Sequence, residues 1–364
     1  MKFLRLAFYV LIAQLVLSGC AGEAVEETSS SSSSEITFDA YVGRNASTRA
    51  GINNIDSLKG KEWYSGFGVF ARYNHNGKIS SLMDNEHVTW EENHWKYTNT
   101  RYWPNEGTVD FYAFAPYHQD VELVSPYSNS NKADSTYYIE FTSSTAPVDL
   151  VWGAQIGKKA PISPTDSKVK FQFKHALARL SFDITANQDL EENGAVITVD
   201  SVKLYGDSID EDKGAFDITG YLNLKIGVWD SIVGDVNSRA VYTWTPTGLE
   251  NGTSFKLSAS QLDHTCKKIE NAPNSYLCII PQTKYFPFYL KITYTVTQGD
   301  FEEKVTVKKN LLDVLRPGVS NPSFTFERGK AYVFHLKLSL DPINFNVTPK
   351  VEDWNGVIDE TMPL

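Results

Sequence analysis

Apolar and polar residues alternate with a period of two in long stretches of this chain, and no other feature restricts its fold as much. In 288–296 the residues Phe, Leu, Ile, Tyr and Val alternate with Tyr, Lys and Thr, and 332–340 shows the same period. This period places one set of side chains on one face of a β-strand. From residue 63 onward, such stretches are separated by Gly, Asn, Pro and Asp, and a helical period is almost absent. We therefore predict an all-β fold built from β-sandwiches.

The alternation changes frame at 174–177. Odd-numbered residues are apolar in 169–173, whereas even-numbered residues are apolar in 178–184. A β-bulge or a passage to a second sheet would explain the change. The chain has 364 residues, which is enough for about two domains. We therefore predict two β-sandwich domains in tandem, an N-terminal one over 35–175 and a C-terminal one over 176–364.

The charge balance argues against one class of partner. The chain has 34 Lys and Arg against 44 Asp and Glu, a net charge of −10, and no basic stripe compensates for it. Nucleic-acid binding depends on basic surfaces that neutralise phosphates, so no nucleic-acid partner is expected.

The N-terminus has the features of an export signal over 1–19. Lys2 and Arg5 precede an apolar run from Leu6 to Leu17, and the sequence Leu-Ser-Gly-Cys ends at Cys20. This resembles the bacterial lipoprotein box, which predicts lipid attachment at Cys20; the alternative is a plain secretory signal with an incidental Cys. The run is too short to span a bilayer, so acyl chains such as palmitate would supply the anchor.

A Ser- and Glu-rich segment follows over 20–34. It contains Glu23, Glu26 and Glu27 and six consecutive serines from Ser29. Such a composition cannot bury a core, which predicts a flexible tether. The acidic residues after Cys20 resemble the signal that sends some Bacteroidetes-type lipoproteins to the outer face of the outer membrane.

Two further cysteines, Cys266 and Cys278, flank a turn-rich stretch. In an oxidising periplasm a disulfide between them would close a loop and contribute about 2 to 3 kcal/mol. The alternative is two unpaired core thiols.

The first predicted strand begins after the tether. Its apolar face is formed by alternate residues, which are Ile36, Phe38, Ala40 and Val42. The next segment, 44–50, is small and polar and includes Arg49, which is typical of an exposed loop that proteases cut. A cut there would disconnect the strand, and its loss would uncover a groove worth roughly 5 to 8 kcal/mol of side-chain burial. Another strand would have to fill it; the alternative is an ordinary first strand and linker.

The last predicted strand resembles the first in its apolar order. Ile343, Phe345 and Val347 alternate with polar residues, and Val351 follows Pro349. Either strand could therefore occupy the same kind of groove.

Motifs for catalysis or metal binding are not found. The seven histidines are scattered without zinc-site spacing, and no nucleophile elbow, P-loop or dinucleotide fingerprint occurs. His175 lies between two apolar runs and is expected to be a satisfied, partly buried residue. The acidic stretch before Gly214, with Asp207, Asp210, Glu211 and Asp212, lacks the EF-hand register and is expected to be a solvated loop rather than a calcium site. No enzymatic activity, metal or cofactor is predicted.

Five aromatic residues support an alternative function. They lie close in sequence and are Trp90, Trp95, Tyr97, Tyr102 and Trp103. As an exposed platform they would stack on sugars, giving a monomeric surface glycan-binding lipoprotein. The competing interpretation is that most of them belong to the core.

Several loose motifs, in order along the chain, resemble the fimbrillin superfamily, the FimA/Mfa-type subunits of type V pili from Bacteroidales-type bacteria. They are Thr48-Arg49-Ala50, Tyr102-Trp103-Pro104, Val109 to Pro116, Phe173 to Leu180, Gly329 to Tyr332, and Val351 to Trp354.

The resemblance implies transthyretin-like β-sandwiches, lipoprotein export and assembly by strand exchange. An arginine-specific surface protease would cut after Arg49 and release the first strand, and a neighbour's strand from 343–351 would replace it. The implied partners are other pilus subunits, that protease, the outer membrane through the lipid anchor, and a receptor on a host or bacterial surface. The implied location is the fimbrium at the outer membrane, with a role in cell adhesion.

Overall fold

The protein is almost entirely β-structure in the computed structural model, which describes residues 34–42, 55–60, 65–125, 137–143, 148–163, 168–186, 195–230, 239–244, 255–258, 267–268, 276–338 and 346–353. The only helices among these residues are a 3-10 helix, η1 (Ile55–Lys59), and one short α-helix, α3 (Leu311–Leu315). The predicted all-β class is therefore confirmed.

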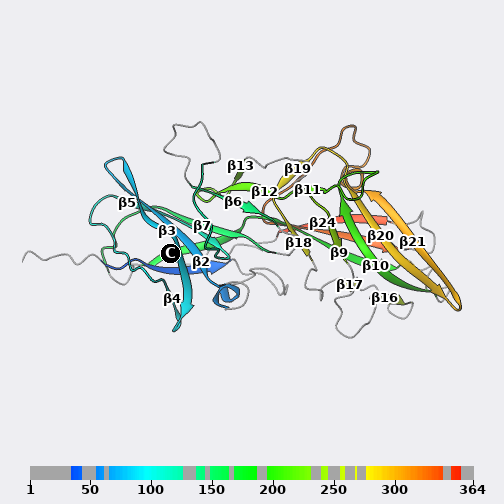
Figure 1. Ribbon diagram of the computed structural model, residues 1–364, viewed down its shortest axis with the longest axis horizontal. Coiled ribbons are helices and arrows are strands. Elements are labelled where there is room, and N and C mark those ends of the chain that lie inside the picture. Colours follow the sequence, from blue (N-terminus) through cyan, green and yellow to red (C-terminus); the bar gives the residue numbers. More distant parts are fainter. Residues whose placement is uncertain are drawn as a thin grey trace, which may run out of the picture.

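A seven-stranded sheet is formed by strands from the first half of the chain (Figure 1). Its order is β1 (Thr37–Val42), β8 (Lys168–His175), β7 (Val151–Lys158), β5 (Thr108–Ala115), β2 (Phe67–His75), β3 (Lys78–Glu91) and β4 (His94–Lys96). One face encloses a core to which both edge strands contribute, because Phe38 of β1 and Trp95 of β4 belong to the same buried cluster. The sheet thus curls around its own hydrophobic side chains.

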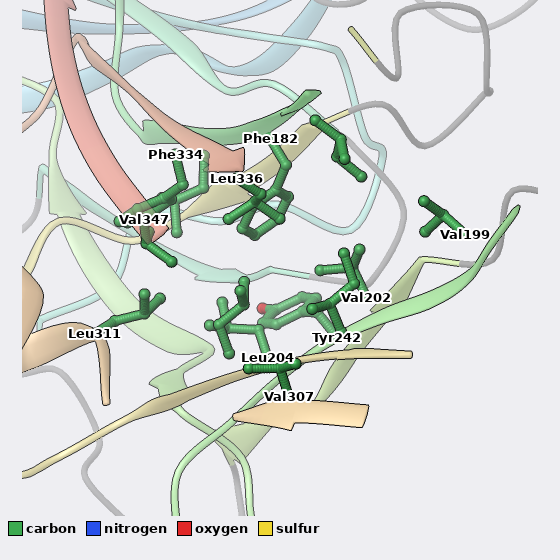
Figure 2. Packing of buried hydrophobic residues seen from close by; sticks show 14 of the residues in the cluster. Phe182, Val199, Val202, Leu204, Tyr242, Val307, Leu311, Phe334, Leu336 and Val347 are labelled. Carbon is green, nitrogen blue, oxygen red and sulfur yellow. The ribbon is translucent and has the colours of Figure 1, made fainter. Parts of the chain in front are cut away.

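Two further sheets face each other across a second core. The first contains β15 (Tyr242–Trp244), β10 (Val196–Tyr205), β20 (Tyr289–Gln298) and β21 (Phe301–Asn310), with β16 (Phe255–Ser258) also on β10. The second contains β17 (Lys267–Lys268), β9 (Ala178–Ala186), β23 (Lys330–Leu338) and β24 (Asn346–Asp353), with β18 (Tyr276–Ile279) also on β9. Figure 2 shows side chains from both sheets, including Leu204 and Phe334, directed into this core.

Three small sheets complete the fold. They are β11 (Phe216–Asp217) with β14 (Arg239–Ala240), β19 (Gln282–Lys284) with β22 (Phe324–Phe326), and the series β13 (Trp229–Asp230), β12 (Thr219–Asn223) and β6 (Tyr138–Thr142).

The frame change at 174–177 corresponds to a passage between sheets. Residues alternate strictly between exposed and buried along β8, which ends at His175 in the seven-stranded sheet. The next strand, β9, begins at Ala178 and pairs with β23 in another sheet. Of the two explanations that the sequence left open, the passage is the one observed.

A third buried cluster joins the two halves of the chain. Trp152 from β7 lies in it with Leu222 and Ile280 from the second half. The guanidinium of Arg328 lies 5.3 Å from the Trp152 ring centre, and β6 from the first half pairs with β12 from the second. The two-domain division at residue 175 stays a prediction.

Candidate functional site

Strand β1 lies at one edge of the seven-stranded sheet (Figure 1, blue). It pairs in parallel with β8, from Thr37 opposite Lys168 to Val42 opposite Phe173. The paired residues are 131 positions apart in the sequence. Because β8 is the only strand next to β1 in the order of this sheet, removal of β1 would separate no other pair of strands. It would also expose the hydrogen-bonding groups of β8.

The predicted apolar face of β1 is confirmed. Ile36, Phe38 and Ala40 are at most 3% exposed, and Val42 is 9% exposed. Tyr41 on the opposite face is 43% exposed. One face of the strand is therefore inserted into the core, and the other faces outward.

Phe38 is surrounded by aromatic rings from four separate segments. Its ring lies 5.4 Å from Tyr97, 5.9 Å from Phe171, 6.2 Å from Phe111 and 6.4 Å from Phe67, measured between centroids. The Phe171 ring is stacked, and those of Phe67 and Phe111 meet Phe38 edge to face. Such geometries are the favoured ones for aromatic pairs, so the pocket is shaped for a ring.

The residues just before β1 are bonded to a second part of the chain, residues 97–103. The Ile36 amide donates to the Arg101 carbonyl (2.8 Å), and the Trp103 amide donates to the Ser34 carbonyl (3.0 Å). The Tyr97 hydroxyl donates to the Ile36 carbonyl (2.7 Å). Burial raises the pKa of Tyr97 to about 12, so this hydroxyl remains a donor at alkaline pH values where an exposed tyrosine ionises. Nothing in the sequence pattern pointed to this second edge contact.

The last strand also lies at an edge. β24 pairs antiparallel with β23, from Lys330 opposite Asp353 to Lys337 opposite Asn346. Val347 is 7% exposed and points into the second core, as Figure 2 shows, whereas Val351 is 51% exposed. Ile343 and Phe345 lie outside the described residues. The proposed donor segment is thus paired within its own chain over its second part.

The aromatic stretch does not form an exposed sugar platform. Trp95 and Trp103 are 6% and 4% exposed and belong to the first core, and Trp90 and Tyr97 pack against it. Among the five, only Tyr102, at 56%, is an exposed residue. The interpretation that most of these residues belong to the core is therefore confirmed, and the alternative of an exposed platform is not supported.

The acidic loop between β10 and β11 is tied to a row of lysines. Lys203, Lys291 and Lys308 stand opposite one another on three adjacent strands. A Glu211 carboxylate oxygen lies 2.6 Å from Lys291 Nζ and the other lies 2.6 Å from Lys308 Nζ. Hydrogen bonds from these two lysines lower the pKa of Glu211 to about 2. Glu211 therefore offsets the repulsion between the lysine ammonium groups on these strands. In the described parts of the chain, no group of three or more His, Cys, Asp or Glu residues is placed to hold a metal ion.

Replacing Glu211 with Gln is expected to lower the free energy of unfolding at pH 7 by about 1 to 2 kcal/mol, after allowance for solvent screening of a pair near the surface. Because the folded pKa is depressed, this contribution is complete above the ordinary pKa near 4.5 and is lost as the pH falls toward 2. Urea unfolding should therefore separate the two proteins at pH 7 and not at pH 2. Asp212→Asn, at an exposed partner of Lys203, is the matched control and should leave the midpoint nearly unchanged.

Two titratable residues, His175 and Cys278, are buried. His175 is 4% exposed, and its Nδ1 lies 2.9 Å from Asp149 Oδ2, which confirms that this histidine has a partner, though it is more deeply buried than expected. Cys278 is 1% exposed, and burial raises the pKa of its thiol. Cys266 lies outside the described residues, and the disulfide between them stays a prediction.

The other sequence predictions also fall outside the described residues. The export signal over 1–19, the lipid attachment at Cys20 and the cleavage at Arg49 all do so. In the portion of the chain that the structure covers, no helix is long and apolar enough to cross a membrane.

Comparison with known proteins places the chain in a family. The profile of the fimbrillin-like family matches residues 48–354. The chain belongs to this family. Fimbrium subunit Fim1C of Phocaeicola vulgatus is 23% identical over 380 aligned residues, which cover 96% of each chain. The fimbrillin-like family and this fimbrium subunit agree with the resemblance found in the sequence motifs.

A solved structure shares the fold of this fimbrillin-like chain. The crystal structure of a fimbrial protein from Bacteroides vulgatus superimposes with a TM-score of 0.59 at 20% identity. The match covers 88% of this chain and 99% of that one. The architecture described above is therefore one that a fimbrial protein adopts.

Proposed function

We propose that this protein is a structural subunit of a type V pilus that polymerises by strand exchange after proteolysis. Cleavage after Arg49 releases β1, and the 343–351 segment of a second subunit takes its place. The observation that carries the proposal is the position of β1, an edge strand whose apolar face is inserted into the core. Main-chain bonds to β8 supply strength, and alternate side chains supply register.

The free energy of side-chain burial favours replacing β1 with another strand over leaving its groove empty. Burial of the four apolar side chains of β1 contributes roughly 5 to 8 kcal/mol, so a cut strand would remain bound until another strand took over its contacts. Because β1 pairs with only one strand over 37–42, that replacement leaves the rest of the sheet intact. Cleavage thus removes the covalent link, and the incoming strand completes the release.

The donor segment is held in its own sheet mainly by the pairing of β24 with β23. Of the β24 side chains whose burial is defined, only Val347 is buried, and Pro349 and Val351 are not. A tail donated to a groove on the next molecule forms a head-to-tail contact, which does not close on itself and so builds a filament.

The remaining parts of the proposal concern location and partners. The subunit would be exported as a lipoprotein anchored through Cys20 in the outer membrane, and an arginine-specific surface protease would release it for assembly with other pilus subunits. Its relatives are named as fimbrial subunits rather than as enzymes, which supports a structural role in adhesion, with a receptor on a host or bacterial surface.

Limited proteolysis of the purified full chain tests the proposal. Treatment with an arginine-specific protease is expected to give a new N-terminus at Ala50, followed by a ladder of oligomers in native electrophoresis. Cleavage at Ala50 without oligomers would count against strand exchange, and a chain that stays intact would count against Arg49 as the site.

A further inference from the structure

Large and small side chains alternate along the interface between β1 and β8. Phe38 stands opposite Val169, and Ala40 stands opposite Phe171. The Phe171 ring is stacked on the Phe38 ring, with an interplanar angle of 21°. A small residue at position 40 leaves room for the Phe171 ring. The groove that β1 fills therefore has a deep subsite for an aromatic ring at the Phe38 position and a shallow one at the Ala40 position.

The aromatic residues that line the deep subsite belong to other strands of the seven-stranded sheet. Phe67 is on β2, Phe111 is on β5 and Phe171 is on β8. All three side chains are fully buried. They do not depend on the covalent link between β1 and the rest of the chain. After β1 has left, these rings would still define where an aromatic side chain fits.

We infer that this aromatic subsite sets the register of the incoming strand, and that Phe345 of a second copy of this chain occupies the position of Phe38. The inference rests on the proposed strand exchange and adds the residue that the groove selects. Its basis is the match between the ring-lined subsite and the only aromatic residue in 343–351.

Alternation restricts the choice of register to even shifts, because an odd shift would turn the apolar residues away from the core. A shift of two in one direction puts Phe345 at the Ala40 position, where the Phe171 ring already fills the space. A shift of two in the other direction puts Val347 in the aromatic subsite. Only the unshifted register places a ring among rings, with Ile343 at the Ile36 position.

This register also explains why the first strand would keep its place until it is cut. Val347 would stand where Ala40 now stands, opposite Phe171, and it is larger than alanine. Extra methyl groups in a packed site are costly, so the chain's own strand fits better than the donor. Exchange would then require that cleavage first remove the advantage of an intramolecular strand.

Disulfide trapping between two engineered chains tests the register. One chain can only accept a strand, and the other can only donate one. The acceptor ends at Pro342 and carries Lys170→Cys on the exposed face of β8, opposite Asp39. The donor carries Arg49→Lys and Asn346→Cys; both chains begin at Ala21 and carry Cys266→Ser. After cleavage of the acceptor, the proposed register puts Asn346 opposite Lys170, and a covalent heterodimer is expected.

A matched acceptor carries Lys168→Cys, two residues earlier on the same face. It is expected to crosslink with the same donor at least about 10-fold more slowly, because the cysteines would no longer be directly opposite. Faster crosslinking at Lys168 would overturn the register. If no heterodimer of any kind forms, strand exchange itself fails.

Substitution in the donor tests the selection of a ring. Phe345→Ala should weaken heterodimer formation about 100-fold, since a full aromatic side chain is lost from a packed pocket. Asn344→Ala, on the outward face of the same strand, should change it less than about 3-fold. Equal binding by the Phe345→Ala and unsubstituted donors would overturn the assignment of this subsite.

Discussion

A subunit with Arg49→Lys is expected to remain monomeric after treatment with an arginine-specific protease, whereas the unsubstituted chain forms a ladder. Lysine keeps the positive charge and the length of the side chain, so the loop and β1 should be unaffected, but the protease no longer has its arginine. The uncut chain would hold β1 in its groove at high effective concentration, and a second molecule's strand could not compete. The measurement is native electrophoresis of the treated protein, with mass spectrometry of its N-terminus.

The same loop provides the matched control for this experiment. Arg44 lies five residues earlier, two positions after the end of β1 at Val42. Arg44→Lys is expected to leave cleavage and polymer formation unchanged. If instead Arg49→Lys polymerises normally and Arg44→Lys does not, the cut lies after Arg44, and Arg49 is the wrong assignment.

The sequence predicted individual strands well because burial on one face imposes a local period. In β8 the alternation of Val169, Phe171 and Phe173 with charged and polar residues identified the buried face, and the structure confirms it. The frame change near residue 175 indicated a β-bulge or a passage between sheets, and the sequence alone did not decide between them; the structure shows the passage.

Pairing partners were not predictable in the same way. The parallel contact of β1 with β8 joins segments far apart in sequence, and no local period encodes it. The bonds from Tyr97 and Trp103 to the start of β1 depend on how the sheet curls. For the same reason, the sequence could not decide whether Trp95 belonged to a surface or to the core.

The lysine row illustrates a charge arrangement that only the assembled sheet creates. Lys203 is almost 90 residues before Lys291, and the register of β10 and β20 brings them opposite each other. Acidic residues clustered before Gly214 suggested a solvated loop or a cation site. The loop is largely exposed, as expected, and the structure shows in addition that Glu211 is held by two lysine ammonium groups, which lower its pKa.

A chain that ends at Pro342 is expected to accept a strand and not to donate one, and therefore to terminate growing polymers. When about one subunit in ten is truncated, polymers are expected to average about ten subunits, because each truncated chain ends a head-to-tail series. The truncation also removes β24 and the burial of Val347, so its folding should first be verified by thermal unfolding. Polymer length can be measured by electron microscopy after cleavage of the mixture.

A chain that ends at Asp353 is the control for this truncation. It lacks the residues after β24 but keeps 343–353, and mixtures that contain it should give polymers of unchanged length. If both truncated chains shorten the polymers equally, donation depends on the residues after Asp353. If neither does, the strand that fills the β1 groove comes from elsewhere. The exposed edge of β8 would then have to be matched to another segment that places an aromatic ring where Phe38 now lies.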